Sequence, residues 1–221
     1  MQNAEASALR TLRSGYFYLF VAAVALTAIS ELLLATIYIS YCPISIMDKI
    51  IFLVFLLLAV VAVSLYAIFW KIRPGMRQLS EVDSRFRICH TGTTLMLVGL
   101  AILVLGLTAV AATFATSSPM GNAAVGWLIL FGVIVIGGTV AFIGYILTFV
   151  ASAFKLYGKY RNPLYAAAGI SFVLSMFLAS ASLFEMSTGL FAKMGNIITA
   201  VGYVLMYTAL GGTIKKLNTQ S

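Results

Sequence analysis

Charged side chains are scarce in this sequence, and that scarcity excludes an ordinary soluble domain. Asp, Glu, Lys and Arg make up 9% of the 221 residues, whereas 62% of the residues are hydrophobic. Soluble domains typically carry about 25% charged residues. A water-soluble fold cannot bury so much apolar surface, but a lipid bilayer can surround it. We therefore expect a polytopic membrane protein.

Acidic residues are the scarcer charged class, with six Asp and Glu against fourteen Lys and Arg and a formal net charge of +8. A nucleic-acid-binding protein would gather such basic residues on one polar face. Here they stand at the ends of long apolar runs, where they act as topology signals and attract anionic lipid headgroups. We expect membrane lipids as partners and no nucleic acid.

Residue types that build catalytic and metal sites are also few. The one histidine, His90, stands beside Cys89, and the second cysteine, Cys42, lies at the other end of the same apolar run. A lone His–Cys pair has too few ligands for a metal site, and cysteines about 30 Å apart cannot form a disulfide. No apolar run holds a nucleophile with a base, or a pair of aspartates. We expect no enzymatic activity, no cofactor and no metal.

Six apolar stretches are long enough to cross a bilayer core of about 30 Å as helices. All but two of the fourteen basic residues fall in alternate connections and in the two tails, and the exceptions are Lys49 and Lys193. The positive-inside rule then places both termini in the cytoplasm. The predicted fold is an all-α integral membrane bundle in one domain, 1–221, with helices at 16–41, 49–70, 92–116, 123–152, 164–185 and 195–213 and a cytoplasmic loop at 71–91.

The longest polar interval, 71–90, separates the second apolar stretch from the third. Pro74-Gly75 predicts a turn, followed by a short helix at the membrane interface. Its arginines either contact lipid headgroups and pair locally with Glu81 and Asp83, or form a docking surface for a partner. The candidate contact residues are Arg73, Arg77, Arg85 and Arg87.

Small residues recur at seven-residue intervals in two of the apolar stretches. Such a repeat keeps one side of a helix facing a neighbour, and close backbone contact drives helix association in lipid. We predict helix packing, rather than a pore lining, at Gly92, Gly99, Gly106, Gly195, Gly202 and Ala209. The 123–152 stretch contains Gly137-Gly138 midway, and it is the candidate for a broken helix of the kind that transporters use.

Glu31 is the one ionisable residue well inside an apolar stretch, and such a residue is a candidate functional site by default. Thr27 lies one turn away and Ser30 is adjacent, so their hydroxyls are expected to share a small polar site with it. Three alternatives remain open. Glu31 is a neutral carboxyl hydrogen-bonded between helices, a proton or cation site, or the partner of a Lys49 or Lys193 side chain that reaches into the membrane.

Several short motifs resemble a family of archaeal multi-pass membrane proteins of unknown function. The motifs lie at 8–15 (ALRTLRSG), 75–86 (GMRQLSEVDSRF), 155–163 (KLYGKYRNP), 202–203 and 207–217. The resemblance implies an archaeal plasma membrane. It implies no activity, and it assigns no functional residue.

Two functions from different classes are compatible with these patterns. The favoured one is a non-enzymatic subunit or scaffold, which packs through its small-residue seams with copies of itself or with other membrane proteins. The alternative is a small proton-coupled transporter or channel that uses Glu31 inside the membrane.

Overall fold

The computed structural model describes residues 2–38, 46–116, 123–182 and 189–219, and nearly all of these residues are helical. The long helices are α1 (Gln2–Tyr38), α2 (Ile46–Tyr66), α4 (Arg87–Thr116), α5 (Ala123–Tyr145), α7 (Pro163–Ser182) and α8 (Leu190–Thr219). Within the described residues, six helical segments are long and apolar enough to cross a membrane. The predicted all-α fold with six such helices is confirmed.

The helices extend beyond the apolar stretches. α1 begins at Gln2, far ahead of residue 16. The range 71–91, expected as a loop, is helical almost throughout: a π-helical segment, η1 (Ala67–Ile72), leads into α3 (Arg73–Val82), and a 3-10 turn, η2 (Ser84–Phe86), leads into α4. Hydropathy marks only where apolar surface ends, whereas a helix continues as long as its backbone bonds and packing are satisfied.

The expected turn at Pro74-Gly75 does not form. Pro74 lies in the first turn of α3, where a missing backbone N–H is best tolerated. A side chain on Gly75 would collide with Leu12 of α1, because its Cβ would lie 2.7 Å from Leu12 Cγ. Gly75 therefore allows α3 to pack closely on α1.

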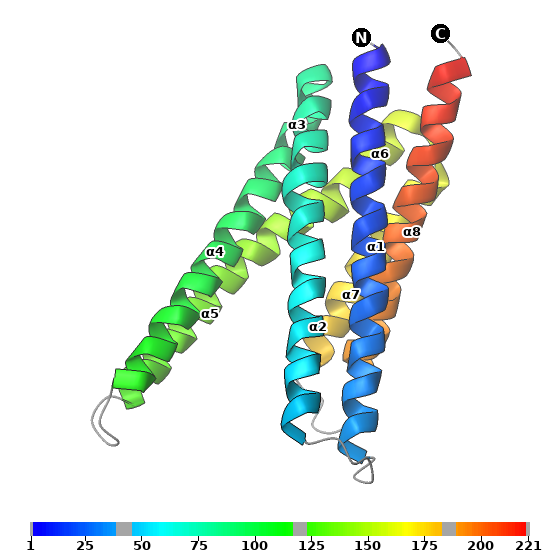
Figure 1. Ribbon diagram of the computed structural model, residues 1–221. Coiled ribbons are helices and arrows are strands. Elements are labelled where there is room, and N and C mark those ends of the chain that lie inside the picture. Colours follow the sequence, from blue (N-terminus) through cyan, green and yellow to red (C-terminus); the bar gives the residue numbers. More distant parts are fainter. Residues whose placement is uncertain (1, 39–45, 117–122, 183–188, 220–221) are drawn as a thin grey trace.

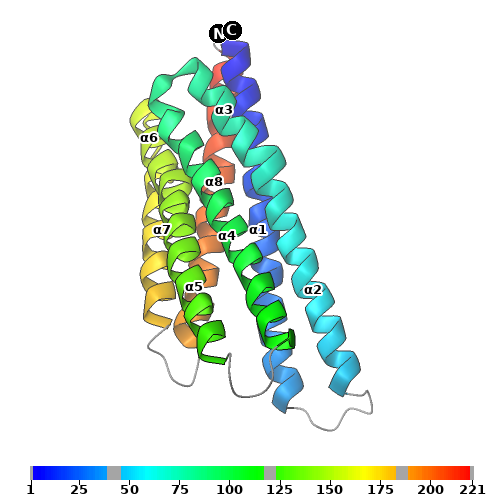
Figure 2. The ribbon, with the colours of Figure 1, turned by 90° about the vertical axis from the view of Figure 1, so that its left-hand side faces the viewer.

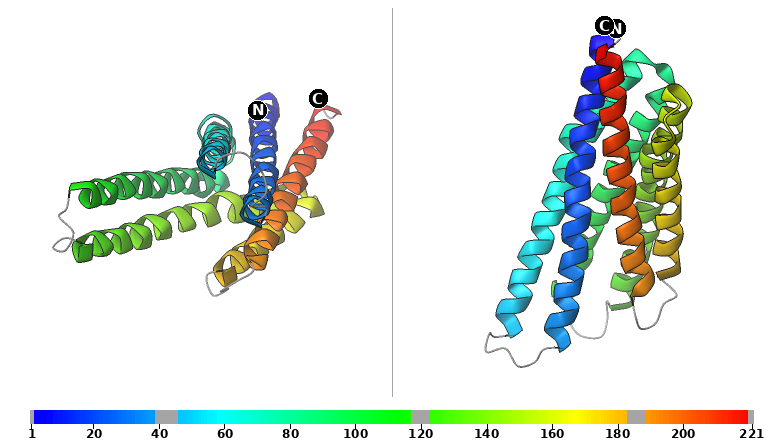
Figure 3. Two further views of the ribbon diagram at one scale, coloured as in Figure 1. Left: turned by 60° about the horizontal axis from the view of Figure 1, so that its bottom comes forward. Right: turned by 90° about the vertical axis from the view of Figure 1, so that its right-hand side faces the viewer.

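Three helix hairpins make up the molecule: α1–α2, α4–α5 and α7–α8. The N- and C-termini lie at the same end of the molecule, together with α3 and α6 (Ala151–Tyr160) (Figures 1 and 2). We call this the basic end, because its segments carry all the basic residues except Lys49 and Lys193. Away from it, the α4–α5 hairpin diverges from the other helices (Figures 1 and 3).

The second helix of each of the first two hairpins ends in the same way. The π-helical segments η1 and η3 (Ile146–Val150) each follow a tyrosine, Tyr66 or Tyr145, and each leads into a ten-residue helix, α3 or α6. α5 itself runs without interruption through Gly137-Gly138. The candidate break is therefore absent from those two residues, and the irregular backbone lies nearer the basic end.

Aromatic rings from all three hairpins meet near the basic end. The ring of Phe149, in η3, has its centroid 6.1 Å from that of Tyr16 in α1, 5.7 Å from that of Phe172 in α7 and 5.7 Å from that of Tyr203 in α8. All four side chains are buried. Each such ring pair contributes about 0.5–1.5 kcal/mol beyond its buried area.

Ion pairs at the basic end join α6 to α1 and to the junction of α3 and η2. The Lys159 Nζ of α6 lies 2.7 Å from Glu5 Oε1 of α1 and 3.5 Å from Asp83 Oδ2, between α3 and η2. The Arg85 backbone N–H donates to Asp83 Oδ1 at 3.0 Å and holds the pKa of Asp83 below its ordinary value, with Lys159 adding to this effect. Asp83 therefore pairs mainly with α6 and not with a neighbouring arginine side chain.

The predicted seam on the third apolar stretch faces α5 and η3. A Cβ on Gly99 would lie 2.3 Å from the backbone N of Ala141, and one on Gly106 would lie 2.2 Å from Val133 Cγ1. A Cβ on Gly92 would lie 2.5 Å from Leu147 Cβ. These distances are too short for any side chain, so the backbones of the α4–α5 hairpin are in close contact.

The second predicted seam faces α7 over part of its length. A Cβ on Gly202 would lie 2.6 Å from Cε1 of Phe172, whereas one on Gly195 would make only ordinary contact, 3.5 Å from Leu178 Cβ. Ala209 is fully buried. The glycines of both seams therefore pack against helices of their own chain.

We predict that Gly99→Ala destabilises the protein by about 1–3 kcal/mol, because the new methyl group forces two backbones apart. Gly138→Ala is the matched control, since no atom lies within 4 Å of its Cβ position. Denaturant unfolding of both variants in the same detergent tests the prediction. Equal stabilities of the two variants would show that the seam is not in close contact.

Candidate functional site

Glu31 has a counter-ion on another helix. Its Oε1 lies 2.8 Å from Lys193 Nζ in the first turn of α8, and the Glu31 and Lys193 side chains are 56% and 29% exposed. Of the three alternatives left open by the sequence, the structure shows the ion pair with Lys193. The side chain of Lys49 lies outside the described residues. The pair links α1 to α8 at the end of the molecule opposite the basic end.

Thr27 and Ser30 do not form the expected polar site with Glu31. The Thr27 hydroxyl donates to the Ala23 carbonyl at 3.0 Å, and the Ser30 hydroxyl donates to the Thr27 carbonyl at 2.7 Å. Hydroxyls in helices often satisfy themselves on the preceding turn in this way. In the part of the chain that the structure describes, neither hydroxyl bonds to Glu31.

An apolar groove of about 530 Å³ lies between α1 and α8, and Glu31 is part of its lining. Thr27 and Glu31 are its polar members, and both come from α1. The remaining lining residues are Phe20, Val24, Ala28, Ile197, Ala200, Val201, Val204 and Leu205. We call this the α1–α8 groove.

A second recess, of about 450 Å³, lies where α5 faces α7 and α8. We call it the hairpin cleft, because it separates the α4–α5 hairpin from the α7–α8 hairpin. Its lining is rich in hydroxyl and amide groups, unlike that of the α1–α8 groove. The polar residues are Tyr145, Ser175, Ser180, Ser182, Asn196 and Thr199.

Asn196 is the residue of the hairpin cleft that the sequence patterns missed. The hydroxyls of Ser175, Ser180 and Thr199 donate to carbonyls of their own helices at 2.8–3.0 Å. Among the described residues, no group forms a hydrogen bond with the Asn196 side chain. An unpartnered amide in an apolar surrounding costs several kcal/mol. The sequence could have drawn attention to Asn196, because it is the only asparagine inside the six apolar stretches.

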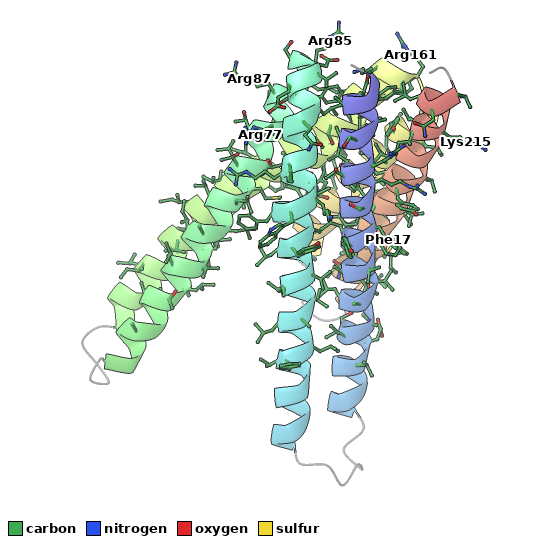
Figure 4. All side chains as sticks on the ribbon, turned by 45° about the horizontal axis from the view of Figure 1, so that its top comes forward. Phe17, Arg77, Arg85, Arg87, Arg161 and Lys215 are labelled. Carbon is green, nitrogen blue, oxygen red and sulfur yellow. The ribbon has the colours of Figure 1, made fainter. Side chains whose placement is uncertain are left out.

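The four candidate arginines lie along α3 and the start of α4. Arg77 Nε is 3.2 Å from Glu81 Oε1, so the expected local pairing of Arg77 with Glu81 forms. Arg85 and Arg87 are exposed, and Figure 4 shows their side chains projecting from the basic end. Arg73 is half-buried. The four guanidinium groups therefore do not converge on one pocket.

A comparison with known protein families assigns the chain to one of them. The family model for proteins of unknown function named DUF973 matches residues 5–221. The chain belongs to the DUF973 family. The match agrees with the resemblance of the sequence motifs to a family of unknown function. No curated protein and no solved structure matches the chain.

The two recesses of this DUF973 member offer hydrogen-bonding groups and apolar surface. Within the described ranges, no cluster of three or more His, Cys, Asp or Glu side chains is arranged to hold a metal ion. Cys89 is buried and His90 is half-buried, at the start of α4. The hairpin cleft offers an amide and hydroxyl oxygens, and the α1–α8 groove offers hydrocarbon contact.

We predict energetic coupling between Glu31 and Lys193. Glu31→Gln and Lys193→Gln each remove one charge and leave the other unpaired, so each single change should destabilise the protein, and the double change should cost less than their sum by at least about 0.5 kcal/mol. Unfolding of the four proteins in lipid nanodiscs measures this coupling. Additive effects would mean that the ion pair does not form in the membrane.

Proposed function

We propose that this protein is a non-enzymatic subunit of a membrane assembly, and that its hairpin cleft receives a transmembrane helix of another protein. The partner helix is apolar and carries a hydrogen-bonding side chain at the depth of Asn196. Six helices that are long and apolar enough to cross a membrane support placing the protein in one. The role of the protein as a subunit is our proposal.

The single observation that carries this proposal is the unpartnered amide of Asn196 beside an open cleft. Hydrocarbon tails of lipids cannot bond to an amide, whereas a polar side chain on a neighbouring helix can. Hydrogen bonds between membrane helices contribute on average only about 0.6 kcal/mol each. Asn196 would therefore determine the position and identity of the partner more than the strength of binding.

The location of the contact differs from the sequence-based expectation. Gly92, Gly99, Gly106 and Gly202 are in close contact with helices of the same chain. Their seams are therefore already occupied. The diverging α4–α5 hairpin leaves its outer faces open instead, with Leu128 and Phe131 among the most exposed large side chains (Figure 1).

The transport alternative has less structural support. Glu31, the residue that a transporter would use, is held in an ion pair with Lys193. A broken helix would also favour transport, but α5 is continuous through Gly137-Gly138. We retain the placement of both termini in the cytoplasm, and of the protein in an archaeal plasma membrane, as part of the proposal. The basic end and the family motifs support it.

Site-specific photo-crosslinking in the native membrane tests the proposal. A crosslinking residue at Ala179, which lines the hairpin cleft, should form an adduct with a membrane protein of one defined mass. The matched control is Ile170, which is exposed on the same helix toward the basic end. Because the partner is positioned by the amide, Asn196→Leu should reduce the adduct several-fold.

Two results would contradict this function. One is an adduct at Ala179 whose yield does not change with Asn196→Leu. The other is a particle, released by mild detergent, whose mass corresponds to a single chain and which has formed no protein adduct at Ala179. In that case, proton flux through reconstituted vesicles, with and without Glu31→Gln, would become the deciding measurement for the transport alternative.

A further inference from the structure

A basic recess of about 310 Å³ opens between α1 and α8 at the basic end. Its lining combines two guanidinium groups with aromatic rings, so charge and apolar surface meet in one place. The lining residues are Arg10, Arg13, Ser14, Phe17, Tyr18 and Tyr207. Phe17 marks this region in Figure 4, on the side of the recess nearer the middle of the molecule.

Arg13 is held in this recess by contacts that leave hydrogen-bond donors unused. Its Cζ lies 4.3 Å from the centroid of the Tyr207 ring. The missing side chain of Gly211 makes room for it, because a Cβ there would lie 3.1 Å from Arg13 Cζ. The Arg13 Nε is buried, and it has no hydrogen-bond partner among the described residues. A buried donor without a partner is costly, so the site calls for an acceptor.

Both arginines of the recess lack an acidic partner in the described part of the chain. Arg10 Nη2 reaches only the neutral Asn218 Oδ1, at 3.5 Å. The carboxylates whose side chains the structure describes are all paired with other cations. These pairs are Glu5 with Lys159, Asp83 with Lys159, Glu81 with Arg77, and Glu31 with Lys193. The ligand that this recess lacks is therefore an anion.

The basic recess and the α1–α8 groove follow one another along α1. On α1, seven of the lining residues recur at alternating intervals of three and four, which places them on one face of the helix. They are Arg10, Arg13, Phe17, Phe20, Val24, Thr27 and Glu31. From Arg13 to Thr27 this face is about 21 Å long, more than half the thickness of a bilayer core.

We propose that this face of the α1–α8 pair binds one lipid molecule, with its phosphate headgroup at Arg10 and Arg13 and a hydrocarbon chain in the α1–α8 groove. Arginine presents a planar set of donors that matches the oxygens of a phosphate group. The apolar lining below it, including Val24 and Val201, matches a chain. A free phosphate ion would use the recess but not the groove, and the position of both on one face of α1 favours the lipid.

Native mass spectrometry of the delipidated full-length protein with dioleoyl phosphatidic acid tests the headgroup contact. Wild-type protein should retain one tightly bound lipid. Arg13→Gln should weaken that binding about tenfold or more, because a hydrogen bond to a charged group is lost. Arg161→Gln is the matched control: Arg161 is exposed at the same end but does not line the recess. Equal binding by wild type and Arg13→Gln would overturn the proposal.

A second arm separates a lipid from free phosphate. Ala28→Trp fills the α1–α8 groove and should weaken binding of the dioleoyl lipid several-fold, while Val21→Trp, on an exposed part of α1 outside that lining, should not. If Ala28→Trp binds the lipid normally and inorganic phosphate displaces it, the site recognises the phosphate group alone, and the assignment of a hydrocarbon chain to the α1–α8 groove is wrong. If Arg13→Gln does not fold, Arg10→Gln tests the headgroup contact, because Arg10 is exposed. Weaker lipid binding by Arg10→Gln would support the contact, and unchanged binding would overturn it.

Discussion

Packing of aromatic rings around Phe149 is the interaction on which the arrangement of the three hairpins depends. Each hairpin is closed by its own contacts, most tightly in α4–α5, where Gly99 and Gly106 bring two backbones together. Between hairpins, the buried rings of Tyr16, Phe172 and Tyr203 meet Phe149 near the basic end. Apolar burial does not hold helices together in lipid, so shape-matched contacts of this kind must do so. Through Phe149, these rings join the α4–α5 hairpin to α1, α7 and α8.

Concentrating these contacts at one end has a structural consequence at the other. The ion pairs of Lys159 reinforce the basic end, whereas the α4–α5 hairpin diverges from the other helices away from it. The hairpin cleft is the result, and it exposes Asn196 to whatever surrounds the protein. A protein in which one hairpin is joined to the other helices near one end and diverges from them at the other is suited to receive another helix. This is why we favour a subunit role over transport.

The α1–α8 pair has a different character from the hairpin cleft. Its groove is almost entirely apolar, with Arg13 beyond one end and the Glu31–Lys193 pair at the other. Polar groups at both ends of an apolar groove resemble the layout of the membrane itself, which favours an amphiphile. Protein contact at the hairpin cleft and lipid contact at the groove involve separate lining residues, so the two proposals can fail independently.

Local patterns in the sequence determined which segments form apolar helices, that basic residues gather at one end, and where small residues line a helix face. These properties depend on residues close together in the chain, so periodicity reveals them. Only the tertiary structure decided that Gly99 packs against Ala141, that Glu31 pairs with Lys193, and that Arg13 Nε has no hydrogen-bond partner among the described residues. Such pairings join residues that are distant in sequence. They follow from which helices pack together and in what register, which no single helix can specify.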